Sequence, residues 1–132
     1  MSNSTLATYT LISPNKNSPR NHSIDRITIH CFVGQVTAKR GCEVFQPTSK
    51  QASCNYVVGY DGSIGLCVSE SDRSWCSSSS ANDHRAITLE VASESNEPYT
   101  VTEKAFAAML DLVTDICLLY TSPSPRDYAA SR

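Results

Sequence analysis

The hydrophobic and polar positions of this chain predict four strands, two of them joined by a hairpin turn. Residues 26–33, "RITIHCFV", alternate and are rich in β-branched side chains, as expected of a strand. In residues 54–68, "CNYVVGYDGSIGLCV", two apolar runs flank Asp-Gly. This pattern is typical of a tight hairpin, because Gly62 accepts a positive φ without steric cost. Residues 85–93, "RAITLEVAS", indicate a buried central strand interrupted by one carboxylate, Glu90.

A long helix is predicted over residues 100–119. Thr102 is a suitable N-cap, and Glu103 places a negative charge in the first turn, where it complements the helix dipole. Apolar residues recur there at a spacing of three or four, namely Ala105, Met109, Leu112, Val113 and Ile116. A shorter helix is expected within 34–45, loops at 46–53 and 73–84, and one short strand within 5–12. This order of strands and helices predicts a mixed α/β layer structure.

The two ends of the chain differ from its middle. Residues 1–24 are a polar lead-in rich in Asn, Ser and Pro. After Cys117 the helical pattern stops, and prolines follow at 123 and 125. The string "LLYTSPSPRD" resembles the translated read-through of a sequencing adapter, and a disordered tail is the alternative interpretation. We therefore expect three segments: the lead-in (1–24), an incomplete catalytic domain (25–117) and an unrelated tail (118–132).

Composition excludes several classes of protein. The chain has 132 residues, 40% of them hydrophobic and 18% charged, which suits one domain with a real core. A net charge of −2 offers no basic face for nucleic acid. No apolar run is long enough to cross a membrane, and the first residues lack the pattern of a signal peptide. The six cysteines form no CxxC pair, so we expect free thiols rather than disulfides, a closed zinc knot or a redox site.

Two residues suggest chemistry. His30 ends an apolar strand, although a single histidine is more often structural than a metal ligand. Glu90 interrupts a strand. If both faces of the sheet are covered, its buried carboxylate needs a partner, a metal or a raised pKa. If Glu90 lies on an open face, its presence indicates no function. A strand-end histidine beside a carboxylate on a neighbouring strand fits metal-assisted hydrolysis, in which the metal lowers the pKa of water and the carboxylate moves the proton.

Three motifs, in order, resemble a known family. "ITIHC" (27–31), "ASCNYVVGYDGSI" (52–64) and "SSSSANDHRAITLEVA" (77–92) are similar to the zinc-dependent N-acetylmuramoyl-L-alanine amidases, which include phage endolysins and are related to peptidoglycan recognition proteins. The resemblance implies a mixed sheet flanked by helices with Zn²⁺ in a groove on one face. It also implies hydrolysis of the amide between the lactyl group of muramic acid and L-alanine in bacterial peptidoglycan.

The same resemblance implies roles for individual residues. His30 matches the first zinc ligand, and Glu90 matches the strand carboxylate that serves as general base or orients water. Asn55 and Tyr56 would lie near the groove as substrate-binding residues of a more structural kind. Trp75 would stack on a sugar or on the stem peptide, with packing at the rim as the alternative. His84 is expected to cap a loop or face solvent.

The sequence departs from the family after the long helix. The family pattern calls for a second histidine on a strand beyond that helix and then for a Cys or Asp ligand, and nothing after Cys117 supplies either. A catalytic zinc needs about three protein ligands, so we expect little or no activity from the chain as written, and an unpaired sheet edge where the last strand is missing. A binding module of the same fold is the rival hypothesis. The protein is expected to be a monomer that stays in the cytoplasm until host lysis and then acts on the cell wall.

Overall fold

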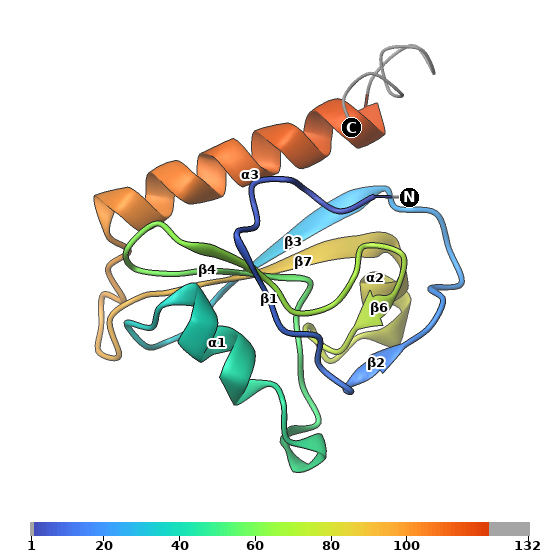
Figure 1. The fold of residues 1–132 in the computed structure, drawn as a ribbon, viewed down its shortest axis with the longest axis horizontal. Coiled ribbons are helices and arrows are strands. Elements are labelled where there is room, and N and C mark those ends of the chain that lie inside the picture. The colour runs from blue at the N-terminus through green and yellow to red at the C-terminus, as the bar shows by residue number, and fades with distance from the viewer. Residues whose placement is uncertain (1, 122–132) are drawn as a thin grey trace.

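A five-stranded mixed sheet forms the centre of the structure (Figure 1). The computed structural model describes residues 2–121, and the strand order is β1-β5-β4-β7-β3. The strands are β1 (Tyr9–Thr10), β3 (Arg26–Cys31), β4 (Tyr56–Val58), β5 (Ile64–Leu66) and β7 (Ala86–Val91). β7 lies between β3 and β4 and is parallel to both, whereas β5 is antiparallel to β4 and parallel to β1. The predicted mixed sheet is confirmed.

The predicted hairpin joins β4 and β5. The backbone N–H of Gly62 donates to the carbonyl of Gly59, and the backbone N–H of Gly59 donates to the carbonyl of Ser63. These two bonds close a short loop between the strands. Gly62 has a φ of +83°, the positive value that the Asp-Gly pair predicts. The hydroxyl of Thr102 donates to the carbonyl of Tyr60 at 2.6 Å, so the hairpin tip also holds the start of the long helix.

Helix α3 (Glu103–Thr121) covers one face of the sheet (Figure 1). Thr102 caps it as predicted, because its hydroxyl accepts the N–H of Ala105 at 3.1 Å. The buried side chains of Leu112 and Ile116 pack there on the alternate residues of the strands. These strand residues are Tyr56, Val58, Ile64, Leu66, Ile87, Leu89 and Val91. None of the helices in residues 2–121 is long and apolar enough to cross a membrane.

Helix α1 (Ala38–Val44) lies on the opposite face (Figure 1). Thr37 caps it, and the helix packs with a second cluster that contains Cys42, Phe45, Cys54, Val57 and Cys67. Cys31, Cys42, Cys54, Cys67 and Cys76 have free thiols, as predicted. Cys54 and Cys67 are buried, whereas Cys31 is exposed, because β3 is an edge strand within the described part of the chain.

The serine-rich segment expected as a loop contains regular structure. β6 (Arg73–Ser74) pairs with β2 (Lys16–Asn17), and α2 (Ser80–Arg85) follows within the predicted loop 73–84. Ser79 caps α2 by accepting the N–H of Asn82 at 3.2 Å. The prediction was wrong here because a run of serines reads as a loop, yet one of them is a favourable N-cap for a short helix.

Residues 2–24 pack against the rest of the structure. They supply β1 and β2, and Ser4, Ser13 and Asn15 are buried. Helix α3 continues to Thr121 and buries Leu119, past the predicted end of the catalytic segment at 117. The rest of the predicted tail, 122–132, lies outside the described residues.

Arg20 fastens the N-terminal segment to the sheet. Its guanidinium is buried and donates hydrogen bonds to five backbone carbonyls, those of Glu70, Asp72, Asp83, His84 and Ala86. These carbonyls belong to the loop before β6 and to the junction between α2 and β7. One side chain therefore fixes both the loop that leads into β6 and the junction that leads into β7, the strand carrying Glu90.

We predict that Arg20→Lys lowers the free energy of unfolding by about 2–4 kcal/mol, because a lysine has at most three donors and leaves buried carbonyls without a partner. Urea denaturation followed by circular dichroism measures the change. Arg40→Lys is the matched control, since Arg40 is exposed on α1. Equal stability of the two variants would contradict this role for Arg20.

Candidate metal centre

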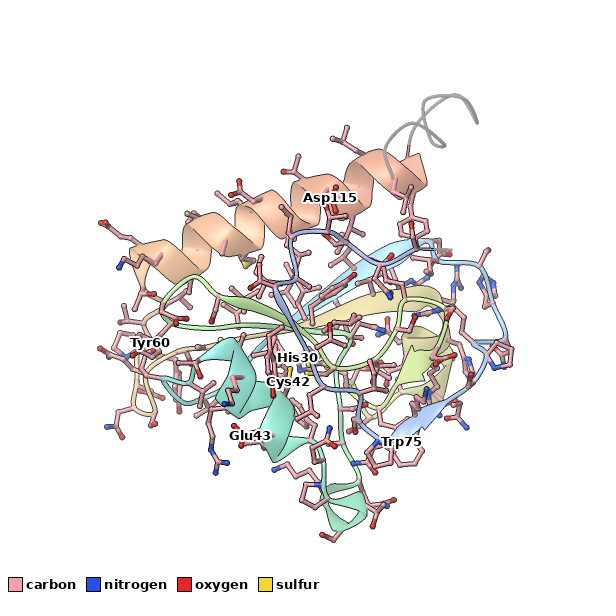
Figure 2. All side chains as sticks on the ribbon, viewed as in Figure 1. His30, Cys42, Glu43, Tyr60, Trp75 and Asp115 are labelled. Atoms are coloured by element: carbon pink, nitrogen blue, oxygen red, sulfur yellow. The ribbon has the colours of Figure 1, made fainter. Side chains whose placement is uncertain are left out.

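His30 and Glu90 lie next to each other at the carboxyl ends of two parallel strands. They are register partners in the β3–β7 pair, and each is the last residue but one of its strand. Register partners point to the same face of a sheet. Figure 2 shows His30 on the side of the sheet away from α3. The two residues singled out in the sequence are thus brought together by strand pairing.

Cys76 joins them from the loop between β6 and α2. Ligand atoms of His30, Cys76 and Glu90 all lie within 4.8 Å of one another, and each residue is partly buried. The thiol of Cys76 donates to Oε1 of Glu90 at 3.7 Å. Sequence reasoning missed Cys76, because its distance from His30 along the chain gives no spacing motif. The only available signal was a cysteine at the start of the serine run that resembles the family.

The donor types and separations fit zinc. Nitrogen, sulfur and carboxylate oxygen are the atoms that zinc binds in proteins. Zinc–sulfur and zinc–oxygen bonds of about 2.3 and about 2.1 Å place two ligands of a tetrahedral ion about 3.6 Å apart. The sulfur–oxygen separation of 3.7 Å between Cys76 and Glu90 is close to that value.

Asp83 holds the loop that carries Cys76. Its buried carboxylate accepts the backbone N–H of Cys76 at 3.0 Å, the N–H of Ser77 at 3.1 Å and the hydroxyl of Ser77 at 2.6 Å. Asp83 lies in α2, whose Asn82 side chain donates to the hydroxyl of Thr28 on β3 at 3.0 Å. The loop is therefore fixed relative to the strand that carries His30.

Burial changes the acidity of two groups in the centre. It raises the pKa of Glu90 to about 7 against the smaller opposing effects of the Cys76 hydrogen bond and of Lys50. A carboxyl group with such a pKa can both accept and donate a proton near neutral pH. Burial, together with the carboxylates of Glu90 and Asp83, raises the pKa of the Cys76 thiol.

Two clefts give access to the centre. Glu90 lines one of them together with Phe45, Lys50 and Ala52. Cys76 lines the other with Ala52, Arg73 and Trp75. Ala52 is common to both clefts, so the cleft beside Glu90 adjoins the cleft beside Cys76. An extended molecule lying along both clefts would pass the metal centre.

The residues predicted to bind substrate have different positions. Trp75 lines the second cleft, and its indole N–H donates to Asn17 at 2.7 Å (Figure 2). Asn55 is fully buried, and its side-chain amide bonds the carbonyl of Val68 and the N–H of Thr88. Tyr56 is fully buried in the cluster under α3, where its hydroxyl donates to Glu70. In this structure Asn55 and Tyr56 have no surface with which to contact a substrate.

The other two histidines lie outside the group of candidate ligands formed by the described residues. The ring of His84 accepts the backbone N–H of Asn21 at 3.0 Å and so helps to hold the N-terminal segment. His22 is exposed, and its ring bonds the carbonyl of Ser23 at 2.6 Å. His84 thus bonds the segment before β3, where the sequence predicted a loop cap or a solvent-facing side chain.

Comparison with known proteins identifies the family. The profile described as N-acetylmuramoyl-L-alanine amidase matches residues 20–130, which is most of the chain and includes all three candidate ligands. The chain belongs to this amidase family. No protein in the curated set matches the sequence of this amidase.

Solved structures of low sequence identity share its fold. A mutant of PlyL is 16% identical with a TM-score of 0.70, over 87% of this chain and 76% of that one. A selenomethionine derivative of AmpD is 12% identical with a TM-score of 0.71, over 97% and 95% of the two chains. A mutant endolysin from Bacillus subtilis is 14% identical with a TM-score of 0.68, over 86% and 76%. These likenesses bear out the predicted amidase fold.

We predict that Asp83→Asn lowers the free energy of unfolding of the amidase by about 1–3 kcal/mol, because an amide NH₂ would face N–H and O–H donors of the Cys76 loop. Urea denaturation measures the effect. Asp111→Asn, on the exposed face of α3, is the control that should change stability little. A loss of the same size in both variants would show that the contacts of Asp83 are not responsible.

Proposed function

We propose that this chain is a zinc-dependent N-acetylmuramoyl-L-alanine amidase of the endolysin type that hydrolyses the lactyl–L-alanine amide of peptidoglycan. The observation that carries the proposal is the pairing of His30 with Glu90 at the open, carboxyl end of parallel strands in a chain of the amidase family. Ligand sites of open α/β sheets lie at this end of the strands. We further propose that the protein acts as a monomer on the cell wall after host lysis.

The proposal assigns His30 to the metal and Glu90 to proton transfer. Zinc, when bound, supplies a Lewis acid that lowers the pKa of water and polarises a carbonyl oxygen. His30 would hold the metal through a ring nitrogen. Glu90, one strand away and partly buried, would take the proton released when water attacks the amide carbon and return it to the leaving alanine nitrogen.

The cleft beside Cys76 suits a peptide with carboxylates. Trp75 offers an indole face, and the Arg73 guanidinium lines the same cleft. One guanidinium N–H group of Arg73 donates to Asn17 at 2.6 Å, whereas its buried Nε has no partner among the described residues. A carboxylate of the stem peptide is a group that the guanidinium of an arginine lining this cleft would bind. We therefore propose that the stem peptide occupies this cleft.

The site also predicts slow hydrolysis. Catalytic zinc sites use three protein ligands and keep a separate group to move protons. Among the described residues only three potential ligands gather at the centre, and one of them is Glu90. If Glu90 binds zinc, the three gathered residues include no other carboxylate that could act as general base. We expect the chain as written to have little activity.

Digestion of purified cell walls tests this function. With zinc present, we expect the chain to release free alanine amino groups about 10²-fold or more slowly than the Bacillus subtilis endolysin, because a positioned general base contributes about 10²–10⁴-fold. An amidase releases amino groups without new reducing sugar ends, so both are measured. His30→Ala should abolish the residual release.

Release at the rate of the endolysin would contradict the expected low activity. Reducing ends in place of amino groups would contradict the amidase assignment. Sedimentation with cell walls but no release, at any zinc concentration, would favour the second candidate, a non-catalytic peptidoglycan-binding module. The cleft that contains Trp75 and Arg73 beside an incomplete set of ligands favours that candidate.

We predict that Trp75→Ala weakens binding to soluble peptidoglycan fragments by about 5–30-fold, which corresponds to about 1–2 kcal/mol, because it removes the aromatic face of the cleft. Isothermal titration calorimetry measures the affinity. Trp75→Phe should keep most of the affinity. Tyr99→Ala removes an exposed aromatic residue that lines neither cleft and should have no effect. Unchanged affinity in Trp75→Ala would place Trp75 at the rim as a packing residue.

A further inference from the structure

We infer that Cys76 is a zinc ligand, so that this chain binds Zn²⁺ through His30, Cys76 and Glu90. The inference deepens the proposed function and rests on its assignment of His30 to the metal. It adds a thiolate from the loop between β6 and α2, a residue that the family resemblance did not assign.

The geometry supports this ligand set. The three ligand atoms come from three separate elements, β3, the loop after β6, and β7, and lie within 4.8 Å of one another. Cys76 and Glu90 are already at the separation of two tetrahedral ligands, 3.7 Å between Sγ and Oε1. Zinc would therefore replace the thiol hydrogen bond to Glu90 with two metal bonds, and the thiol proton would leave to solvent.

The surroundings hold the sulfur in place. Asp83 bonds the backbone N–H of Cys76, and the hydroxyls of Ser74 and Thr88, on β6 and β7, lie 2.6 Å apart just before the loop. Ala52 and Trp75 flank the cleft that Cys76 lines, which leaves one side open to solvent and substrate. A site with three ligands and one open side matches the coordination of zinc in enzymes.

Metal titration tests the inference without relying on hydrolysis. The reduced chain competes with a chromophoric chelator for Zn²⁺, and Co²⁺ replaces zinc for absorption spectroscopy. We expect affinity below micromolar and a thiolate-to-cobalt charge-transfer band in the near ultraviolet. Cys76→Ser should remove the band and weaken zinc binding by more than about tenfold, since loss of even an outer-shell partner costs about 10–100-fold.

Cys31→Ser is the matched control. Cys31 directly follows His30 on β3 and lines the cleft that contains Glu90, but its thiol is not among the ligand atoms that gather at the centre. This variant should keep both the band and the affinity. Unfolding curves of both serine variants establish that each is folded.

Two results would overturn the inference: no charge-transfer band in the Co²⁺-loaded wild type, or equal zinc affinity of the wild type and Cys76→Ser. Neither result touches the proposed amidase function, which depends on His30 and on release of amino groups. Conversely, the chain could show the cobalt–thiolate band and yet neither cut nor bind cell walls. That result would overturn the proposed function and support the metal site.

Discussion

The parallel register of β3 with β7 is the constraint on which the rest of the site depends. It sets His30 opposite Glu90 and, at the same time, turns Ile87, Leu89 and Val91 toward α3. Because side chains alternate along a strand, a slip of one residue in either strand would bury a charged or polar group under α3 and expose apolar ones. The packing of the core on one face therefore fixes the positions of His30 and Glu90 on the other face. The same strand register determines both the stability of the fold and the geometry of the site.

Two polar side chains extend this register to the loops. Arg20 satisfies carbonyls on both sides of the β6–α2 segment, and Asp83 satisfies the N–H groups of the loop that Cys76 opens. The guanidinium of Arg20 donates to backbone carbonyls, and the carboxylate of Asp83 accepts from backbone N–H groups. These buried backbone groups are therefore paired. A segment rich in serine, with few apolar side chains of its own, can be held rigidly in this way. That rigidity lets a loop residue share a centre with two strand residues.

Local patterns were sufficient for much of the fold. Alternation in 26–31, the Asp-Gly hairpin and the apolar stripe of α3 each arise from neighbours in sequence, and the sequence located His30 and Glu90 for the same reason. Cys76 could not be found in this way, because its proximity to His30 is created by the β3–β7 pairing and by contacts of Arg20 and Asp83 that span tens of residues. The helix α2 was missed because its start depends on one serine cap within a run of four. The exposure of Cys31 depends on strand order, which no local pattern encodes.

The same closeness that makes the centre fit a metal limits what it can do as a catalyst. A carboxylate that moves protons must have a lone pair free of the metal, whereas a third ligand must give that lone pair up. Glu90 lies 3.7 Å from the Cys76 sulfur and beside His30, so it is placed for either role but not for both at once. Zinc bound by all three residues would be held firmly and would lack its proton carrier. A centre that used His30 and Cys76 alone would keep the carrier and hold zinc weakly. Under the proposed assignments, affinity for the metal and rate of hydrolysis would therefore be opposed through a single side chain.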